Sequence, residues 1–215
     1  MERLSIAKDH RHFVLGGKPF FWQADTVWAA FTNITDREWE DYLSLRQRQG
    51  FNVLQINVLP QWDRSLPDLG LEPFERGADG TYRFDKLCGE YFDHAERMLD
   101  KLRNHGFIPA LVPLWVNYVP DTWASREDTS AVIPAEYLDR YYEVIITRFQ
   151  KFAPVYLCSG DSRFETEQEI RSYQKLMKKI KELDPCALTT LHPGGGYLEP
   201  PEVLLSDPNL DFYMV

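Results

Sequence analysis

Asp161 is the side chain of this sequence best suited to acid–base chemistry. It ends the run Leu-Cys-Ser-Gly-Asp at 157–161, where small residues before the carboxylate would let a ligand approach closely. A carboxyl group walled by aromatic side chains keeps its proton to higher pH and can donate it to a glycosidic oxygen. The alternative interpretation is a loop aspartate that caps the helix after it.

Asp25 and His192 are two further candidates. Asp25 follows Trp-Gln-Ala, and its carboxylate could bind a pair of sugar hydroxyls; a buried aspartate that organises the first turn is the alternative. His192 begins the run His-Pro-Gly-Gly-Gly and could donate a hydrogen bond to a substrate. A histidine satisfied within the core would produce the same pattern.

Aromatic and amide side chains surround these candidates near the ends of apolar runs. Flat aromatic faces stack on the C–H faces of sugar rings, and an indole N–H can reach a hydroxyl group. The segment 59–85 is long for a connection in a compact domain, and loops of that length are usually functional. The pattern predicts a carbohydrate-binding set made of Asp25, Trp28, Gln55, Asn57, Gln61, Trp62, Trp115 and His192.

The elements that must position these residues alternate along the chain. Four amphipathic patterns predict helices, the first beginning at a Thr35–Glu38 capping box and ending before Gly50. Near-continuous apolar runs between them are typical of parallel strands buried on both faces. The six predicted strands cover 20–25, 51–59, 107–114, 155–159, 188–192 and 210–215, after a β-hairpin over 4–21 that turns at Gly16-Gly17.

The second predicted strand favours a barrel over a doubly wound sheet. Val53, Gln55 and Asn57 share one face of it, and a polar face on a buried strand suits a barrel interior. No glycine-rich nucleotide-binding motif follows the first strand. We therefore predict one α/β domain, 1–215, with the (β/α)8 TIM-barrel fold and about six of its eight units. The open edge should be covered by a second copy or by residues absent from this sequence.

Charge and composition exclude several classes of partner. Lys and Arg number 24 against 33 Asp and Glu, a net charge of −9, which disfavours nucleic acids and anionic membranes. No cofactor is expected. No metal site is expected either, because a hairpin separates His10 and His12 from the first barrel strand. Three scattered cysteines and the lack of a signal-peptide core predict a cytoplasmic protein.

The combination of motifs resembles one known family, the apiosidase-like glycoside hydrolases of glycoside hydrolase family 140. The resemblance implies a TIM-barrel, retaining exo-glycosidase that acts on branched plant sugars. It also implies that Asp161 is the acid/base and that the nucleophile is a glutamate at the end of the seventh strand, beyond Val215. Ser159 departs from a glycine of the family pattern. The matching segments are 22–28, 49–55, 91–92, Trp115, 159–161, 190–194 and 210–212.

The predicted function is therefore hydrolysis of a glycosidic bond in a plant-type oligosaccharide or polysaccharide. A cellulase-like endo-glycosidase is the alternative within the enzyme class, since related barrels differ mainly in their loops. A catalytically inactive carbohydrate-binding barrel is the alternative from another class. A glutamate at the seventh strand would distinguish the enzyme from the binder.

Overall fold

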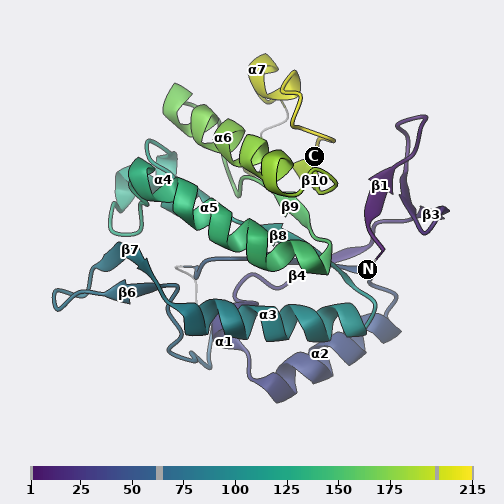
Figure 1. Ribbon diagram of the computed structural model, residues 1–215, viewed down its shortest axis with the longest axis horizontal. Coiled ribbons are helices and arrows are strands. Elements are labelled where there is room, and N and C mark those ends of the chain that lie inside the picture. Colours follow the sequence, from purple (N-terminus) through teal and green to yellow (C-terminus); the bar gives the residue numbers. More distant parts are fainter. Residues whose placement is uncertain (1, 62–64, 197–198, 215) are drawn as a thin grey trace.

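The computed structural model describes residues 2–61, 65–196 and 199–214 and contains a five-stranded parallel sheet (Figure 1). The strand order is β10-β9-β8-β5-β4. The register aligns Thr26, Gln55, Ala110, Val155 and Leu188 across the sheet. The predicted α/β class with a parallel sheet is confirmed. The strand bounds are β4 (Ala24–Thr26), β5 (Val53–Asn57), β8 (Ile108–Val112), β9 (Val155–Leu157) and β10 (Leu188–Thr190).

Four long helices connect these strands. They are α2 (Asp36–Arg48), α3 (Gly89–Asn104), α5 (Ala135–Phe149) and α6 (Glu167–Leu183). The predicted capping box opens α2: the Thr35 hydroxyl accepts from the Glu38 N–H, and the Glu38 carboxylate accepts from the Thr35 N–H. At α6 only half of that motif forms, because the Glu169 carboxylate accepts instead from the N–H of Glu165.

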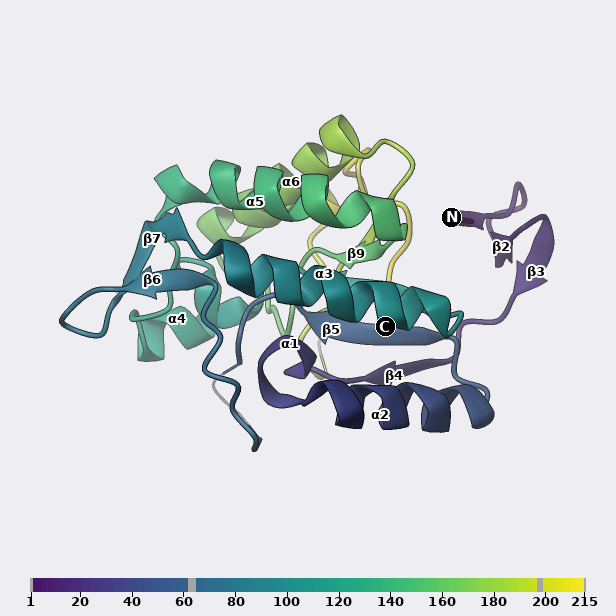
Figure 2. The ribbon, with the colours of Figure 1, turned by 60° about the horizontal axis from the view of Figure 1, so that its bottom comes forward.

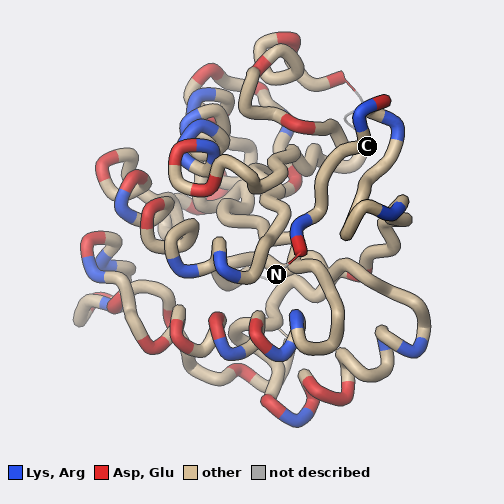
Figure 3. Tube along the Cα trace, turned by 45° about the vertical axis from the view of Figure 1, so that its right-hand side comes forward, with Lys and Arg blue, Asp and Glu red and all other residues tan. Residues whose placement is uncertain are grey.

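Ion pairs between oppositely charged side chains join neighbouring long helices. Figure 3 shows Lys and Arg interspersed with Asp and Glu along the chain. Within the described part of the chain, no helix is both long and apolar enough to cross a membrane. Ion pairs link α2 to α3, α3 to α5 and α5 to α6 in turn; examples are Lys101 with Asp36 at 3.0 Å, Arg148 with Glu96 at 2.5 Å and Lys175 with Asp139 at 3.0 Å.

A small antiparallel sheet precedes the barrel strands. It contains β1 (Leu4–Ile6), β2 (Phe13–Leu15) and β3 (Lys18–Phe20), and the predicted turn is confirmed, with positive φ at both Gly16 and Gly17. The single strand predicted over 20–25 is wrong in extent. Phe20 ends β3, and the barrel strand β4 begins only at Ala24.

The sixth predicted strand, 210–215, does not form among the described residues. The Asp211 N–H donates to the carbonyl of Thr189 at 3.1 Å, but the Asp211 carboxylate accepts from the Thr189 N–H at 2.7 Å. The Asp211 side chain thus accepts the hydrogen bond that a backbone carbonyl of a sixth strand would accept. The hydrogen-bond ladder of the parallel sheet therefore ends at β10. The Phe212 ring instead packs against Phe13, with ring centroids 5.0 Å apart.

The segment predicted as a long loop contains a hairpin of its own, β6 (Phe74–Arg76) and β7 (Tyr82–Leu87). Phe74 packs edge-on against Phe84, which supplies a local apolar contact that holds the two strands together. Figure 2 shows this hairpin and α4 (Trp123–Glu127) at the end of the molecule opposite to β1–β3. The remaining short helices are α1 (Ala30–Asn33), η1 (Val116–Tyr118), η2 (Gln150–Phe152) and α7 (Glu202–Leu205).

Candidate active site

Asp161 lies in the loop after β9, and the backbone there is specialised. Its φ is +52°, in the left-handed region that aspartate tolerates better than most residues. The indole N–H of Trp123 donates to the Asp161 carbonyl at 2.9 Å. The Asp161 side chain is 38% exposed, so the carboxyl group is accessible and yet partly desolvated.

His192 lies directly beside this carboxyl group. Its Nδ1 is 3.7 Å from Asp161 Oδ1, and the same nitrogen accepts the backbone N–H of Asp161 at 3.4 Å. Burial raises the pKa of the Asp161 carboxyl above its ordinary value, and the nearby His192 opposes that rise. Burial also lowers the pKa of His192, against the influence of Asp161. Both shifts favour uncharged forms, as a proton donor beside a neutral imidazole requires.

Ser159 holds the two loops of the site together. Its hydroxyl accepts from the His192 N–H at 2.9 Å and donates to the His192 carbonyl at 3.1 Å. Next to it, Gly194 donates its N–H to the carbonyl of Ser162 at 2.8 Å. The position that departs from glycine in the sequence pattern thus acquires a defined role, which sequence reasoning missed because a hydroxyl reveals its partners only in the fold.

A row of aromatic rings forms one wall of the site. The ring centroids of Trp28 and Trp115 are 5.4 Å apart, and those of Trp115 and His192 are 5.5 Å apart. Trp115 is only 2% exposed and packs on Gly160, where an added Cβ would lie 2.1 Å from the indole. Trp28 is 42% exposed. Trp115 is therefore a buried packing residue next to Gly160, whereas the ring of Trp28 is accessible to solvent.

Buried amide groups line the inner face of the sheet at the same end. Gln55 is 7% exposed and Asn57 is 2% exposed, and the Asn57 N–H donates to the carbonyl of Trp28 at 3.2 Å. Within the described residues, Gln55 Nε2, both side-chain polar atoms of Asn57 and Gln61 Nε2 have no hydrogen-bond partner. Because buried polar groups are normally paired, these amides are suited to a polar ligand.

Asp25 does not join this group. On β4, Asp25 is paired in register with Leu54 of β5, and its side chain faces α2. There its Oδ2 accepts a hydrogen bond from the Tyr42 hydroxyl at 2.7 Å and forms an ion pair with Arg46 at 2.5 Å. The predicted carbohydrate-binding set is therefore corrected for Asp25, whose side chain contacts α2 and not Asn57, Asp161 or His192. The geometry favours its alternative role as an organiser of the first turn, and Trp28 takes its place at the strand ends.

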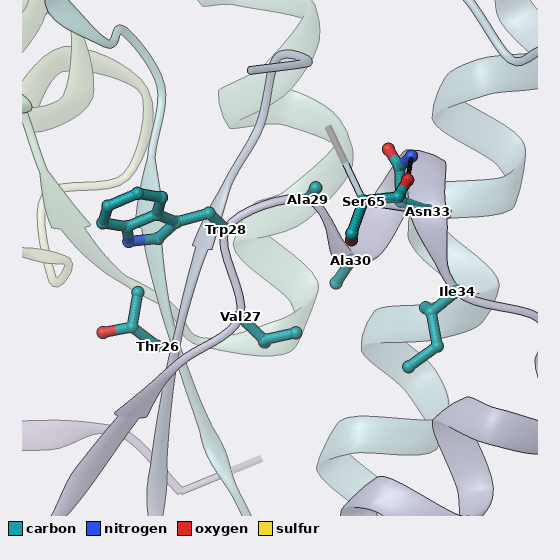
Figure 4. A pocket seen from close by; sticks show the side chains of 8 residues that line it. All are labelled: Thr26, Val27, Trp28, Ala29, Ala30, Asn33, Ile34 and Ser65. Carbon is teal, nitrogen blue, oxygen red and sulfur yellow. Dashed lines mark hydrogen bonds between the residues drawn. The ribbon is translucent and has the colours of Figure 1, made fainter. Parts of the chain in front are cut away.

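A pocket of about 500 Å³ lies beside β4 and α1 (Figure 4). Thr26 and Trp28 lie on one side of it, and Asn33, Ile34 and Ser65 lie on the other. It shares Trp28 with the site but does not include Asp161. The last of the predicted site residues, Trp62, lies outside the described residues.

The Apiosidase-like, catalytic domain family model matches residues 7–215 of this chain, which is nearly the whole sequence. The chain belongs to this family. The carboxyl group that the family resemblance assigns to proton transfer is thus the one found next to His192. No curated protein matches the sequence significantly.

Solved structures show which fold the apiosidase-like domain adopts. A putative glycoside hydrolase from Bacteroides vulgatus ATCC 8482 has a TM-score of 0.75 at 18% identity, covering 97% of this chain and 41% of its own. The endo-1,4-beta-mannanase from Rhizomucor miehei has a TM-score of 0.65 at 12% identity, covering 99% and 70%. These neighbours are TIM barrels, so the five parallel strands of the domain and the four long helices between them correspond to part of one.

A third neighbour adds an exo-acting enzyme. Exo-beta-1,4-mannosidase Op5Man5 from Opitutaceae bacterium strain TAV5 has a TM-score of 0.58 at 18% identity, covering 92% of this chain and 38% of its own. The apiosidase-like domain spans about two fifths of the length of most of these structures. The likeness therefore establishes the fold, and endo-acting and exo-acting enzymes both share it.

Proposed function

We propose that this apiosidase-like domain belongs to a glycoside hydrolase and supplies its general acid/base, Asp161. The observation that carries the proposal is the partly buried Asp161 carboxyl group, 3.7 Å from Nδ1 of His192 at the ends of the parallel strands. Active sites of TIM barrels lie at that end. Burial raises the pKa of the Asp161 carboxyl, which favours the protonated form that a general acid needs.

The reaction would proceed through an oxocarbenium-like transition state. The protonated Asp161 carboxyl transfers its proton to the glycosidic oxygen as the bond from that oxygen to the anomeric carbon breaks. The resulting carboxylate then takes a proton from the incoming water. Retention of configuration requires a second carboxylate about 5–5.5 Å from the first, which forms the glycosyl intermediate. We propose that a glutamate outside residues 1–215 supplies it.

The rest of the site would orient the sugar. The side-chain amides of Gln55, Asn57 and Gln61 are buried and, within the described chain, have atoms that lack partners, so they suit hydrogen bonds with sugar hydroxyls. The exposed face of Trp28 suits stacking on the C–H side of a sugar ring. The donor or acceptor that remains on His192 is its Nε2, because Nδ1 already accepts from Asp161.

The substrate class and mode of action belong to the proposal as well. We propose a plant-type oligosaccharide or polysaccharide and exo action, in keeping with the family. An endo-acting enzyme is the second candidate, and the similarity to the Rhizomucor miehei endo-mannanase supports it. Product analysis separates the two: exo action releases one small product from the first turnover, whereas endo action produces a series of oligosaccharides.

We also propose that the protein acts in the cytoplasm. Its three cysteines, Cys88, Cys158 and Cys186, are all free, and Cys158 is fully buried. Free thiols suit a reducing compartment. Cell fractionation with an antibody against the domain tests this assignment, and recovery in the culture medium or periplasm would contradict it.

The test of Asp161 is a comparison of leaving groups in the longest protein that the gene encodes. In Asp161→Asn, hydrolysis of natural glycosides should fall by about 10²–10⁴-fold, the usual contribution of general acid catalysis. Aryl glycosides need little protonation, so their first step should lose much less. The matched control is Asp85→Asn, an exposed aspartate on β7. Equal, small losses on both substrates would refute the role of Asp161. Sugar binding without turnover in the unmodified protein would indicate an inactive carbohydrate-binding barrel.

A further inference from the structure

A second pocket is lined by Trp123, whose indole N–H contacts the Asp161 loop. Its volume is about 270 Å³, close to the lower end of the ~300–1,000 Å³ range typical of ligand pockets. Helix α4, with η1 before it and the loop after it, forms the walls. The lining residues are Asn117, Trp123, Ala124, Glu127, Asp128 and Ala131.

Trp123 connects this pocket to the candidate acid. Its ring lines the pocket, while its indole N–H donates to the backbone carbonyl of Asp161 at 2.9 Å. In glycoside hydrolysis the general acid protonates the oxygen that departs with the leaving group. The sugar that departs therefore lies next to the acid, and a pocket that shares a wall with the Asp161 loop is placed to hold it.

A buried amide indicates that the pocket takes a polar ligand. Asn117 lines the pocket, is 7% exposed, and its Oδ1 has no hydrogen-bond partner within the described residues. Its backbone is fixed by the 3₁₀ turn, in which the N–H of Tyr118 donates to the carbonyl of Trp115 at 3.0 Å. Buried side-chain oxygens are normally paired, so a donor supplied by a ligand would complete this one.

The remaining lining residues define the class of ligand. Trp123, Ala124 and Ala131 give an apolar wall, and Glu127 and Asp128 give carboxylates, which accept hydrogen bonds from hydroxyl groups. Hydrogen bonds from Ser130 lower the pKa of Asp128, so this group stays ionised. Apolar side chains and acceptor groups lining the same pocket suit a sugar ring, which has a C–H face and a rim of hydroxyls.

The charge around the pocket favours a neutral sugar over an acidic one. Two arginines approach the pocket wall, Arg126 from α4 and Arg163 over the Trp123 ring at 5.1 Å. Both pair with Glu165, at 2.5 and 3.8 Å respectively. Glu165 offsets one of these two positive charges. Together with Glu127 and Asp128 the charged groups around the pocket therefore carry one net negative charge, which disfavours a carboxylated ring.

We propose that this pocket is a subsite for a neutral sugar ring of the leaving group. The assignment of the pocket to the leaving group rests on the proposed function. Binding of a sugar in the pocket can nevertheless be measured without turnover. It adds Trp123, Asn117 and Glu127 to the residues that determine which glycosides the domain selects.

The experiment is an NMR titration of the unmodified protein carrying ¹⁵N-labelled tryptophan. The probes are glucose, galactose, mannose and arabinose, with galacturonate as the charged counterpart of galactose. We expect at least one neutral sugar to shift the Trp123 indole signal saturably, and galacturonate to bind roughly tenfold more weakly than galactose. The buried Trp39 indole, which donates to the carbonyl of Met98, is the internal control and should not shift.

Variants then assign the contact. Asn117→Ala should weaken binding by roughly tenfold, the contribution of one hydrogen bond to a polar ligand group, and Glu127→Gln should reduce the preference against galacturonate. The matched control is Asn104→Ala, at the exposed end of α3. The subsite is refuted if none of the neutral sugars, each added up to its own solubility limit, shifts the Trp123 indole signal. If Asp161→Asn leaves hydrolysis intact while Trp123 still shifts, the proposed function fails and the subsite stands.

Discussion

The backbone N–H of Asp161 donates to Nδ1 of His192 at 3.4 Å, so the imidazole must accept at that nitrogen and carry its hydrogen on Nε2. This contact fixes the tautomer of the neutral ring through a backbone group whose position does not depend on pH. It also holds a neutral acceptor, rather than a cation, beside the Asp161 carboxyl. The proton of the acid is therefore retained to higher pH than an imidazolium neighbour would allow.

The first prediction concerns the stability of Asp161→Asn. Burial raises the pKa of Asp161, so the folded state binds this proton more tightly than the unfolded chain does. Stability is then lost as pH rises from the ordinary aspartate pKa through the raised one. Asn cannot ionise, so the variant should melt at a higher temperature than the unmodified protein near neutral pH. The difference should disappear in acid. Melting curves recorded across pH, with Asp85→Asn as the control, check this; a lower melting temperature at neutral pH would contradict it.

The second prediction tests the packing beneath the site. A Cβ at Gly160 would lie 2.1 Å from the buried indole of Trp115, so Gly160→Ala must displace that ring. We expect a loss of about 1–3 kcal/mol or more in the free energy of unfolding, the usual cost of overpacking a core. Gly195→Ala is the matched control, because nothing lies within 4 Å of its Cβ position. Equal midpoints of urea unfolding for the two variants would show that the Trp115 ring moves at no cost.

The strands and long helices could be predicted from the sequence because local rules determine them. Apolar runs gave β5 and β8, and Thr35 with Glu38 determined the start of α2. Two errors arose where side chains compete with the backbone or depend on register. The Asp211 carboxylate occupies the position of a ladder acceptor, and Asp25 faces α2 because Thr26 shares the face of Gln55. Neither fact can be read from apolar periodicity.

The candidate site was partly predictable for the same reason. Asp161, His192 and Asn57 follow or end strands, and the ends of parallel strands converge, so their meeting follows from topology. The Ser159 hydroxyl and the Trp123 indole were missed as functional partners, because each acts on a backbone group 33 or 38 residues away in the sequence. Such contacts depend on the path of loops, for which the sequence carries no periodic signal.

The third prediction separates the two roles considered for Asp25. In Asp25→Asn the neutral amide replaces a carboxylate that pairs with Arg46 and accepts from Tyr42. We expect a loss of about 1–2 kcal/mol in the free energy of unfolding, because charge-assisted hydrogen bonds become neutral ones. Sugar affinity should be unchanged. Urea unfolding of Asp25→Asn, Tyr42→Phe and the double variant should give non-additive losses. Weaker sugar binding at unchanged stability would return Asp25 to the binding site.

The last prediction concerns the exposed edge of the sheet. Within the described part of the chain, strand β4 pairs with β5 on one side only. Ala24 and Thr26 on this strand are exposed, and the nearby Trp28 ring is 42% exposed. An unpaired edge with apolar neighbours is a template for pairing with another chain. We therefore expect the 215-residue polypeptide by itself to associate with a second copy as its concentration rises, as measured by light scattering. Thr26→Lys places a charge on this edge and should shift the population to monomer, whereas Thr81→Lys, in the exposed β6–β7 turn, should not. A monodisperse monomer at every concentration would mean that the β4 edge is sufficiently protected by its own side chains.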